Sequence, residues 1–260
     1  MKKLVVVKIG GHVVDDEQAL SSFLKQFAAL DAAKLLIHGG GKMASQMSER
    51  LGISPQLVDG RRITNQETLK VVTMVYGGLV NKQVVAQLQG LDCNAIGLTG
   101  ADGNLLRASK RPVDKIDYGF VGDVKVDWVN KELISQFIGL GLAPVIAALT
   151  HDGAGQLLNT NADTMAAVMA QALSKDFEVQ LVYCFEQIGV MKDLDKGLVF
   201  NRMSKENTER YINEGRIHSG MLPKLENAFR AKAYGLKDVR IGHYTALQAL
   251  VNQTEGTEVL

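Results

Sequence analysis

Short apolar runs alternate along the chain with longer segments in which apolar residues recur at helical spacing. The runs are rich in β-branched residues and occupy residues 4–9, 34–38, 94–99, 143–149 and 178–184, with a weaker one at 239–243. Runs of this length and composition predict buried strands. The amphipathic segments occupy residues 16–33, 43–52 and 65–90. This alternation predicts an α/β protein whose mostly parallel sheet is covered by helices on both faces.

Polar residues mark where two of the helices begin. Thr64 or Asn65 can cap the helix at 65–90, and Asp163 can cap or begin a helix that follows it. The less apolar stretch 107–128 predicts a small β-hairpin inserted between strands. In a parallel sheet of this kind the carboxyl ends of the strands and their loops share one edge, where ligands bind.

Composition narrows the class of protein. The chain has 260 residues, 46% of them apolar, and a formal net charge of +1, so its overall field attracts neither nucleic acid nor an anionic membrane surface. No apolar run approaches the roughly 20 residues of a membrane span, and the first residues lack a leader pattern. Cys93 and Cys184 lie in apolar runs and read as reduced thiols. We therefore expect a cytoplasmic protein without nucleic-acid or membrane partners.

Two glycine-rich turns follow apolar strands. Lys8 stands near the end of the first strand and is followed by Gly10 and Gly11, and the run 34–38 leads directly into Gly39–Gly41 and a helix. Glycines let backbone N–H groups approach an anion, which predicts a phosphate site. The alternatives are a lysine that reaches water and a tight strand–helix turn. Neither the P-loop nor the G-x-G-x-x-G pattern is present.

Basic residues mark two further candidate anion sites. Arg61 and Arg62 precede a helix, and arginine suits bidentate binding of carboxylates. Lys224 follows Pro223 at the start of an amphipathic helix, where a helix N-terminus adds to its charge. Solvated basic side chains on the surface are the alternative reading of both.

A polar cluster precedes another apolar helix. Asn159, Asn161 and Asp163 fall within five positions. The asparagines can bind a substrate amide or carboxylate, and the aspartate can orient a cation. Capping alone needs only one such residue, so three favour a functional site over a simple helix cap.

These motifs occur together, in an order that resembles the amino acid kinase family, most closely its N-acetyl-L-glutamate kinases of arginine biosynthesis. The matching runs are KIGGHVV, IHGGGK, VDGRRIT, NAIGLTGADG, GFVGDV, PVIA, GQLLNTNAD and GMLPK, spread over almost the whole chain. The resemblance implies a three-layer αβα sandwich of two closely joined lobes. Residues 1–174 would bind the acylglutamate and form a homodimer interface, and residues 175–260 would bind ATP.

The resemblance also implies how phosphoryl transfer is catalysed. Lys8 and Lys224 match two lysines that neutralise phosphate charge, and Asp163 matches the aspartate that holds them. The backbone amides of Gly11, Gly40 and Gly41 would grip the transferred phosphoryl group. Such a site works by positioning and charge neutralisation. A carboxylate nucleophile is already ionised at pH 7, so no general base is needed.

Substrate and nucleotide binding are implied at further residues. Arg62, Asn159 and Asn161 would bind the α-carboxylate of the substrate and its surroundings. The nucleotide would be contacted by Gly10, Gly11, Glu186 and Gly189 together with the two lysines. The implied reaction is ATP-dependent phosphorylation of the γ-carboxylate of N-acetyl-L-glutamate to N-acetylglutamyl 5-phosphate. Mg²⁺ would be held largely by ATP oxygens, without a protein ligand.

Three features depart from the family pattern. Phe185 and Glu186 stand where the family usually has a Ser/Thr–Asp pair, which leaves the nucleotide contacts of that loop open. Arg61 replaces a commonly apolar residue, and an N-succinyl group with its own carboxylate is therefore an alternative to acetyl. The N-terminal helix of arginine-inhibited hexamers is missing, so the resemblance implies a homodimer without arginine feedback.

Two other classes of function remain as alternatives. The same fold serves kinases of carbamate, aspartate, glutamate and UMP, and the contexts of Arg62 and the run NTNAD favour an acylglutamate over these. A metabolite sensor without catalysis is a rival of a different kind. The joint presence of Lys8, Asp163 and Lys224 favours a kinase over a sensor.

Overall fold

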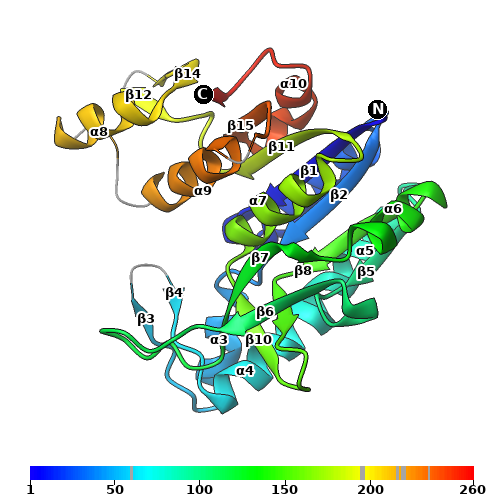
Figure 1. Ribbon diagram of the computed structural model, residues 1–260, viewed down its shortest axis with the longest axis vertical. Helices are drawn as coiled ribbons and strands as arrows, with labels where there is room; N and C mark the ends of the chain where they lie inside the picture. The colour runs from blue at the N-terminus through cyan, green and yellow to red at the C-terminus, as the bar shows by residue number, and fades with distance from the viewer. Residues whose placement is uncertain (59–60, 194–196, 215–216, 218–220, 234) are drawn as a thin grey trace.

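The computed structural model describes residues 1–58, 61–193, 197–214, 217, 221–233 and 235–260. Its centre is an eight-stranded sheet with the order β14-β16-β15-β11-β1-β2-β8-β5 (Figure 1). The strands are β1 (Lys3–Ile9), β2 (Ala33–His38), β5 (Ala95–Leu98), β8 (Ala143–Ala147), β11 (Glu178–Phe185), β14 (Arg202–Met203), β15 (Asp238–His243) and β16 (Thr257–Val259). Neighbouring strands run parallel, except that β15 and β16 are antiparallel. The six strands predicted from apolar runs are confirmed.

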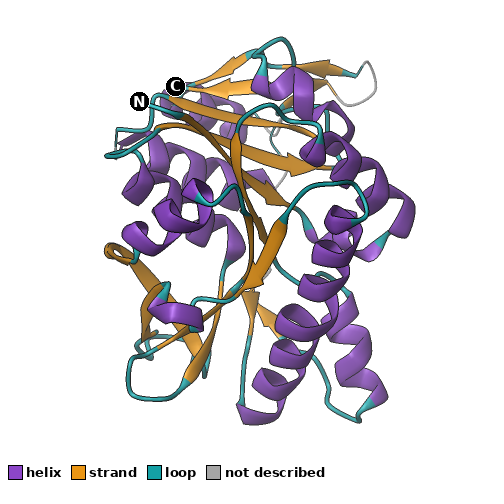
Figure 2. Ribbon diagram, turned by 90° about the vertical axis from the view of Figure 1, so that its right-hand side faces the viewer, coloured by secondary structure: helices purple, strands orange, loops and turns teal. Residues whose placement is uncertain are grey.

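Helices cover both faces of this sheet (Figure 2). Every residue from Leu4 to Ile9 of β1 is buried, and since successive side chains point to opposite faces, both faces must be covered. One layer contains α6 (Lys131–Gly139), α7 (Ala162–Leu173) and α9 (Leu222–Ala233), and the other contains α2 (Glu17–Ala28), α5 (Asn81–Gln89) and α10 (Leu247–Val251). The predicted three-layer αβα sandwich is confirmed.

The helix predicted at 65–90 is continuous but not uniform. It comprises α4 (Gln66–Val72), the π-helical η1 (Thr73–Val80) and α5. Asn65 caps α4 by accepting a hydrogen bond from the Thr68 N–H, as predicted. The π-helical turns fall on the run TMVYGGLV, where two adjacent glycines weaken the α-helical preference.

Smaller elements extend from the sheet. β6 (Leu106–Lys110) and β7 (Val121–Val129) form the predicted hairpin, and with β9 (Leu149–His151) and β10 (Leu157–Thr160) they close into a small barrel. The remaining elements are α1 (Gly11–Asp15), α3 (Met43–Arg50), α8 (Lys205–Asn213), β3 (Leu57–Val58), β4 (Arg61–Arg62), β12 (Met191–Asp193), β13 (Leu198–Val199), η2 (Asp102–Asn104) and η4 (Tyr244–Ala246).

The start of α7 decides between the two roles predicted for Asp163. The cap of this helix is Asn161, whose Oδ1 accepts hydrogen bonds from the N–H and the hydroxyl of Thr164. Asp163 lies in the first turn instead. Its side chain is therefore available for a partner outside the helix.

The sheet runs unbroken across the middle of the chain. β1 pairs with β11 along seven residues, from Lys3–Glu178 to Ile9–Cys184. Residues 174 and 175 lie between α7 and β11. The two halves are thus joined by strand pairing rather than by a linker. Among the helices that the structure describes, none has the length and apolar character of a membrane span.

Candidate active site

A cavity of about 240 Å³ opens at the carboxyl ends of β1 and β2. It contains nine of the residues predicted for the site, namely Lys8, Gly11, Gly40, Gly41, Arg61, Arg62, Asn159, Asn161 and Asp163. These residues come from four separate segments of the chain. Their convergence at this edge follows from parallel strands, whose carboxyl ends all point the same way.

Lys8 and Asp163 form an ion pair at the base of the cavity. Lys8 Nζ lies 2.7 Å from Asp163 Oδ1, and both side chains are at least 86% buried. Tyr183 donates a hydrogen bond from its hydroxyl to the Asp163 carbonyl, which holds the first turn of α7 against β11. The lysine predicted to be out of place in a buried strand is thus neutralised by a carboxylate from another element.

The two glycine-rich turns touch backbone to backbone. A Cβ on Gly11 would stand 2.7 Å from the Gly41 Cα, and one on Gly41 would stand 2.6 Å from the Gly11 carbonyl oxygen. Gly41 also has φ +48°, which L side chains rarely adopt. Asp15 joins the turns by accepting hydrogen bonds from the N–H groups of Lys42 and Met43. The first amides of α3 therefore already have an anionic partner, which leaves those of the glycines for a ligand.

Arg62 presents unsatisfied donors next to this loop. The residue is 9% exposed, and its Nη2 donates to the Ser45 hydroxyl at 2.8 Å. Its Nε and Nη1 are buried without a hydrogen-bond partner among the described residues. Buried guanidinium donors of this kind require an acceptor, and a carboxylate fits their geometry. Arg61 is exposed and lines the same cavity.

Asn159 and Asn161 differ in what their side chains do. Asn159 is buried and donates from Nδ2 to the Thr64 hydroxyl at 3.0 Å, so its Oδ1 faces other partners. Asn161 uses its Oδ1 to cap α7. The capping alternative therefore holds for the Oδ1 of Asn161, while both residues line the cavity.

Lys224 approaches the site from the other half of the chain. It lies in the first turn of α9, with Nζ 5.3 Å from the centre of the Phe185 ring. Burial lowers the pKa of Lys224; nearby Asp163 and Glu186 oppose that shift and Lys8 adds to it. Asp163, which pairs with Lys8, is therefore also near enough to favour the charged form of Lys224.

Besides Lys224, three predicted nucleotide contacts lie outside the cavity lining, namely Gly10, Glu186 and Gly189. Gly10 donates its N–H to the Cys184 carbonyl and packs against Phe185. Glu186 is exposed. At Gly189 a Cβ would stand 2.7 Å from the Thr257 hydroxyl, so packing against β16 already accounts for this glycine.

Tyr76 and Arg111 are among the lining residues that sequence reasoning missed. The Tyr76 ring covers the Gly40 backbone so closely that no Cβ could fit there. Arg111 binds the Asp123 carboxylate through Nε, at 3.0 Å and 3.2 Å, and through Nη2. No motif in the neighbouring sequence pointed to either residue, because Tyr76 lies within a long helix and Arg111 lies within a predicted hairpin.

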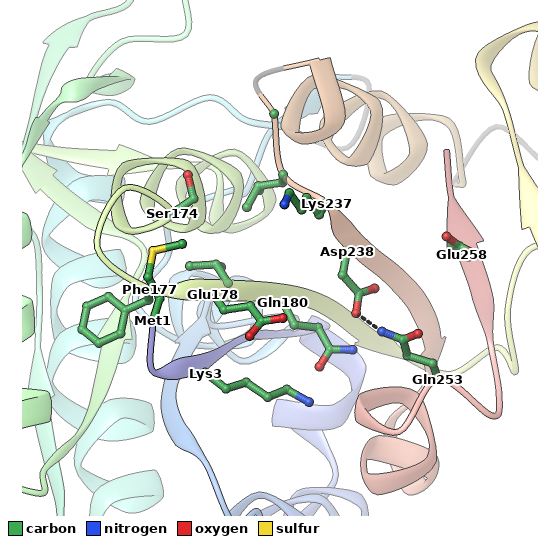
Figure 3. Close-up of a pocket in the computed structure, with 13 residues that line it drawn as sticks. Met1, Lys3, Ser174, Phe177, Glu178, Gln180, Lys237, Asp238, Gln253 and Glu258 are labelled. Atoms are coloured by element: carbon green, nitrogen blue, oxygen red, sulfur yellow. Dashed lines mark hydrogen bonds between the residues drawn. The ribbon is translucent and has the colours of Figure 1, made fainter.

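A larger cavity, of about 490 Å³, lies at the opposite edge of the sheet (Figure 3). Charged and polar side chains from the amino ends of β1, β11 and β15 line it, among them Lys3, Glu178 and Asp238. Asp238 accepts a hydrogen bond from Gln253, and burial raises its pKa. This edge has no glycine-rich turn before a helix, so we assign the active site to the smaller cavity.

Comparisons with known proteins agree with this geometry. The chain is 51% identical over its full length to the acetylglutamate kinase of Cytophaga hutchinsonii, 99% of which is covered. The structure of smu.665 from Streptococcus mutans UA159 matches with a TM-score of 0.81 at 27% identity, covering 100% of this chain and 99% of that one. N-acetylglutamate synthase from Neisseria gonorrhoeae shares the fold with a TM-score of 0.82 at 20% identity, over 99% of this chain and 59% of that one.

A family model extends the match to the motifs themselves. The model of the amino acid kinase family covers residues 3–243. That range includes both glycine-rich turns, the arginine pair, Asp163 and Lys224. The chain therefore belongs to the amino acid kinase family.

Proposed function

We propose that the chain is a kinase that transfers the γ-phosphoryl group of ATP to the γ-carboxylate of N-acetyl-L-glutamate, a step of arginine biosynthesis in the cytoplasm. Relatives named acetylglutamate kinase match it over the full length. The observation that carries the proposal is the pairing, in one cavity, of the Lys8–Asp163 ion pair with the unsatisfied guanidinium of Arg62. The first suits a phosphoryl group and the second a substrate carboxylate.

The residues of the cavity support a division of roles in catalysis. Lys8 and Lys224 neutralise charge that spreads over the phosphoryl oxygens in the transition state, and Asp163 keeps the two ammonium groups together. The amides of Gly11 and Gly41, whose backbones are in contact, bind the same oxygens. The substrate carboxylate attacks directly, so the site needs no proton acceptor.

Substrate recognition rests on the polar wall of the cavity. Arg62 Nε and Nη1 bind the α-carboxylate, which supplies the acceptors that these buried atoms lack. Asn159 is held by Thr64 so that its amide oxygen accepts from the substrate N–H. Residues 1–174 thus form the acylglutamate lobe, and residues 175–260 form the nucleotide lobe.

ATP would be bound by residues of the protein, whereas Mg²⁺ would be bound mainly by ATP itself. Gly10 and Glu186 directly follow β1 and β11, Gly189 lies between β11 and β12, and Glu186 is near enough to act on the charge of Lys224. The described residues hold no group of three or more His, Cys, Asp or Glu side chains arranged for a metal. Mg²⁺ would be held mainly by phosphate oxygens of ATP, where it would supply charge neutralisation.

A homodimer is proposed from the exposed surface of the long helical segment. Met74 and Leu79 of η1 are 54% and 40% exposed. Apolar side chains at this spacing on one helix favour packing against a second copy. Replacing both by lysine should convert a dimer to a monomer in sedimentation experiments.

N-succinyl-L-glutamate is a second candidate substrate, favoured by one observation. Arg61 is exposed at the cavity and has no ion-pair partner among the described residues, and Arg111 lines the same wall. A succinyl group carries a second carboxylate that Arg61 can bind. An acetyl group leaves that arginine to solvent.

The kinase proposal is tested by trapping the product as a hydroxamate with ATP, Mg²⁺ and N-acetylglutamate. We expect acyl phosphate formation by the wild type and none by Lys8→Met, with Lys25→Met as a control for loss of an exposed lysine outside the cavity. If no N-acylglutamate yields a hydroxamate, the proposal is wrong.

Turnover with N-acetyl- and N-succinylglutamate decides the acyl group. If the succinyl compound is preferred, Arg61→Leu should remove most of that preference and leave turnover of the acetyl compound within about twofold. A strong preference for acetyl in the wild type would reject the second candidate.

A further inference from the structure

A buried chain of hydrogen bonds links α5 to the glycine-rich turn after β2. His38 and Asn81 are 0% and 1% exposed. The Asn81 Nδ2 lies 3.1 Å from His38 Nε2, and His38 Nδ1 lies 2.8 Å from the Gly39 carbonyl oxygen. His38 touches no atom that we assign to catalysis, yet it binds the first peptide of the turn.

The partners of Asn81 determine which nitrogen of His38 carries the proton. The Val145 carbonyl, 2.9 Å from Asn81 Nδ2, can only accept, and the Lys82 ammonium, 3.2 Å from Asn81 Oδ1, can only donate. Both contacts give the amide the same orientation, so Nδ2 donates to His38 Nε2. His38 Nδ1 therefore carries the hydrogen and donates it to Gly39. Burial lowers the pKa of His38 to about 4, which keeps this neutral form at pH 7.

The bond to Gly39 acts on the neighbouring amide through the peptide plane. The structure has no cis peptide among its described residues, so the Gly39 carbonyl and the Gly40 N–H point in opposite directions. We propose that His38 is a positioning residue that holds the Gly39–Gly40 peptide so that the Gly40 N–H faces the phosphoryl group during transfer. This inference rests on the kinase function proposed above.

The Gly39–Gly40 peptide needs such an anchor because, among the described residues, only His38 forms a hydrogen bond with it, although the Tyr76 ring packs against Gly40. Three consecutive glycines can rotate their peptides at little steric cost. Asp15 holds only the far end of the turn, at Lys42 and Met43. The Gly40 N–H itself has no hydrogen-bond partner among the described residues, and Gly40 lines the cavity. Without His38 the peptide could turn its carbonyl oxygen towards the phosphoryl oxygens, which would repel them.

The test compares His38→Leu with His38→Asn. Leucine removes the donor, whereas the asparagine amide can reproduce the Nδ1 donor. For His38→Leu we expect kcat to fall roughly 10- to 100-fold, as for loss of one transition-state donor, with the KM of the acylglutamate changed less than about twofold. Binding of ADP with aluminium fluoride, a mimic of the transferred group, should weaken similarly, and binding of ADP alone should not. His38→Asn should recover most of the lost kcat.

Gln180→Leu is the matched control, because Gln180 is a buried polar residue at the opposite edge of the sheet. It should lower the melting temperature without lowering kcat. The inference is wrong if folded His38→Leu keeps wild-type kcat, or if His38→Asn and His38→Leu are equally impaired. Should His38→Leu not fold, ¹⁵N NMR of the wild type decides, since a hydrogen on Nε2 would overturn the inference. An inactive wild type would refute the kinase function alone, and the aluminium fluoride measurements would still test His38.

Discussion

Lys8 and Asp163 show how a single charged pair makes a buried ammonium tolerable. Burial of an isolated ammonium costs several kcal/mol, and the carboxylate 2.7 Å away offsets that cost. Removing either partner leaves the other buried and unpaired. At the residue scale, the candidate site is therefore a set of charges whose partners come from distant parts of the chain.

Lys8→Arg should lower kcat by about 100-fold or more and change the KM of either substrate far less. Arginine keeps the charge but spreads it over a planar group that cannot occupy the position of Nζ beside Asp163. Steady-state kinetics on both substrates measure the effect. An unchanged kcat would remove Lys8 from the catalytic role.

At the carboxyl end of β11, Phe185 and Glu186 stand where the resemblance implies a Ser/Thr–Asp pair. The structure shows what Phe185 contacts there. Phe185 is 3% exposed, packs against Gly10, and lies 5.3 Å from Lys224 Nζ. A cation over an aromatic face is stabilised by about 0.5–2 kcal/mol. The strand end thus supports the charged form of Lys224, which burial opposes.

Phe185→Leu should lower the pKa of Lys224 further and lower kcat by roughly 3- to 10-fold, since a cation–π contact of about 1 kcal/mol is lost. The alkaline limb of the kcat–pH profile should move to lower pH. Phe185→Tyr retains the aromatic face and should leave the profile in place. Identical profiles for the leucine and tyrosine variants would contradict this role.

A second prediction at the scale of secondary-structure elements concerns the glycine-rich turns. Gly41→Ala should destabilise the protein by about 1–3 kcal/mol and abolish most activity, because φ is +48° and the backbone of Gly11 blocks the methyl group. Gly52→Ala is the control. Gly52 has φ +73° with nothing within 4 Å of its Cβ position, so this variant carries the conformational cost alone. Urea unfolding of both variants separates the two contributions, and equal losses would rule out the proposed contact.

At the scale of the whole molecule, one sheet serves both halves of the chain. Strand pairing of β1 with β11 places the Lys8 end of one beside the Phe185 end of the other. The core is continuous across residues 174 and 175, so unfolding of either half exposes apolar surface of the other. The protein should therefore unfold in a single cooperative transition.

That transition should depend on pH through His38. Its pKa is about 4 in the folded protein and about 6.5 when exposed, so the unfolded state binds the proton more tightly. The free energy of unfolding should accordingly fall by up to about 3 kcal/mol as the pH is lowered from 6.5 towards 4. Urea titrations of the wild type and His38→Asn measure this contribution as a difference. Equal pH dependence in the two proteins would contradict it.

Local patterns in the sequence predicted the strands, the long helical segment and the fold class, because burial imposes a period on each element. They also marked Lys8, the glycines, Arg62, Asn159 and Asp163 as chemically unusual. They left open whether Asp163 caps or begins α7, since aspartate and asparagine cap helices equally well.

The sequence by itself determined the order of elements and the residue types able to handle phosphate and carboxylate. Only the tertiary structure decided which of them meet. It paired Lys8 with Asp163, left two nitrogens of Arg62 unsatisfied, added Tyr76 and Arg111, and connected Asn81 to Gly39 through His38. These contacts join residues far apart along the chain, and such distances are set by the packing of the sheet and its helices.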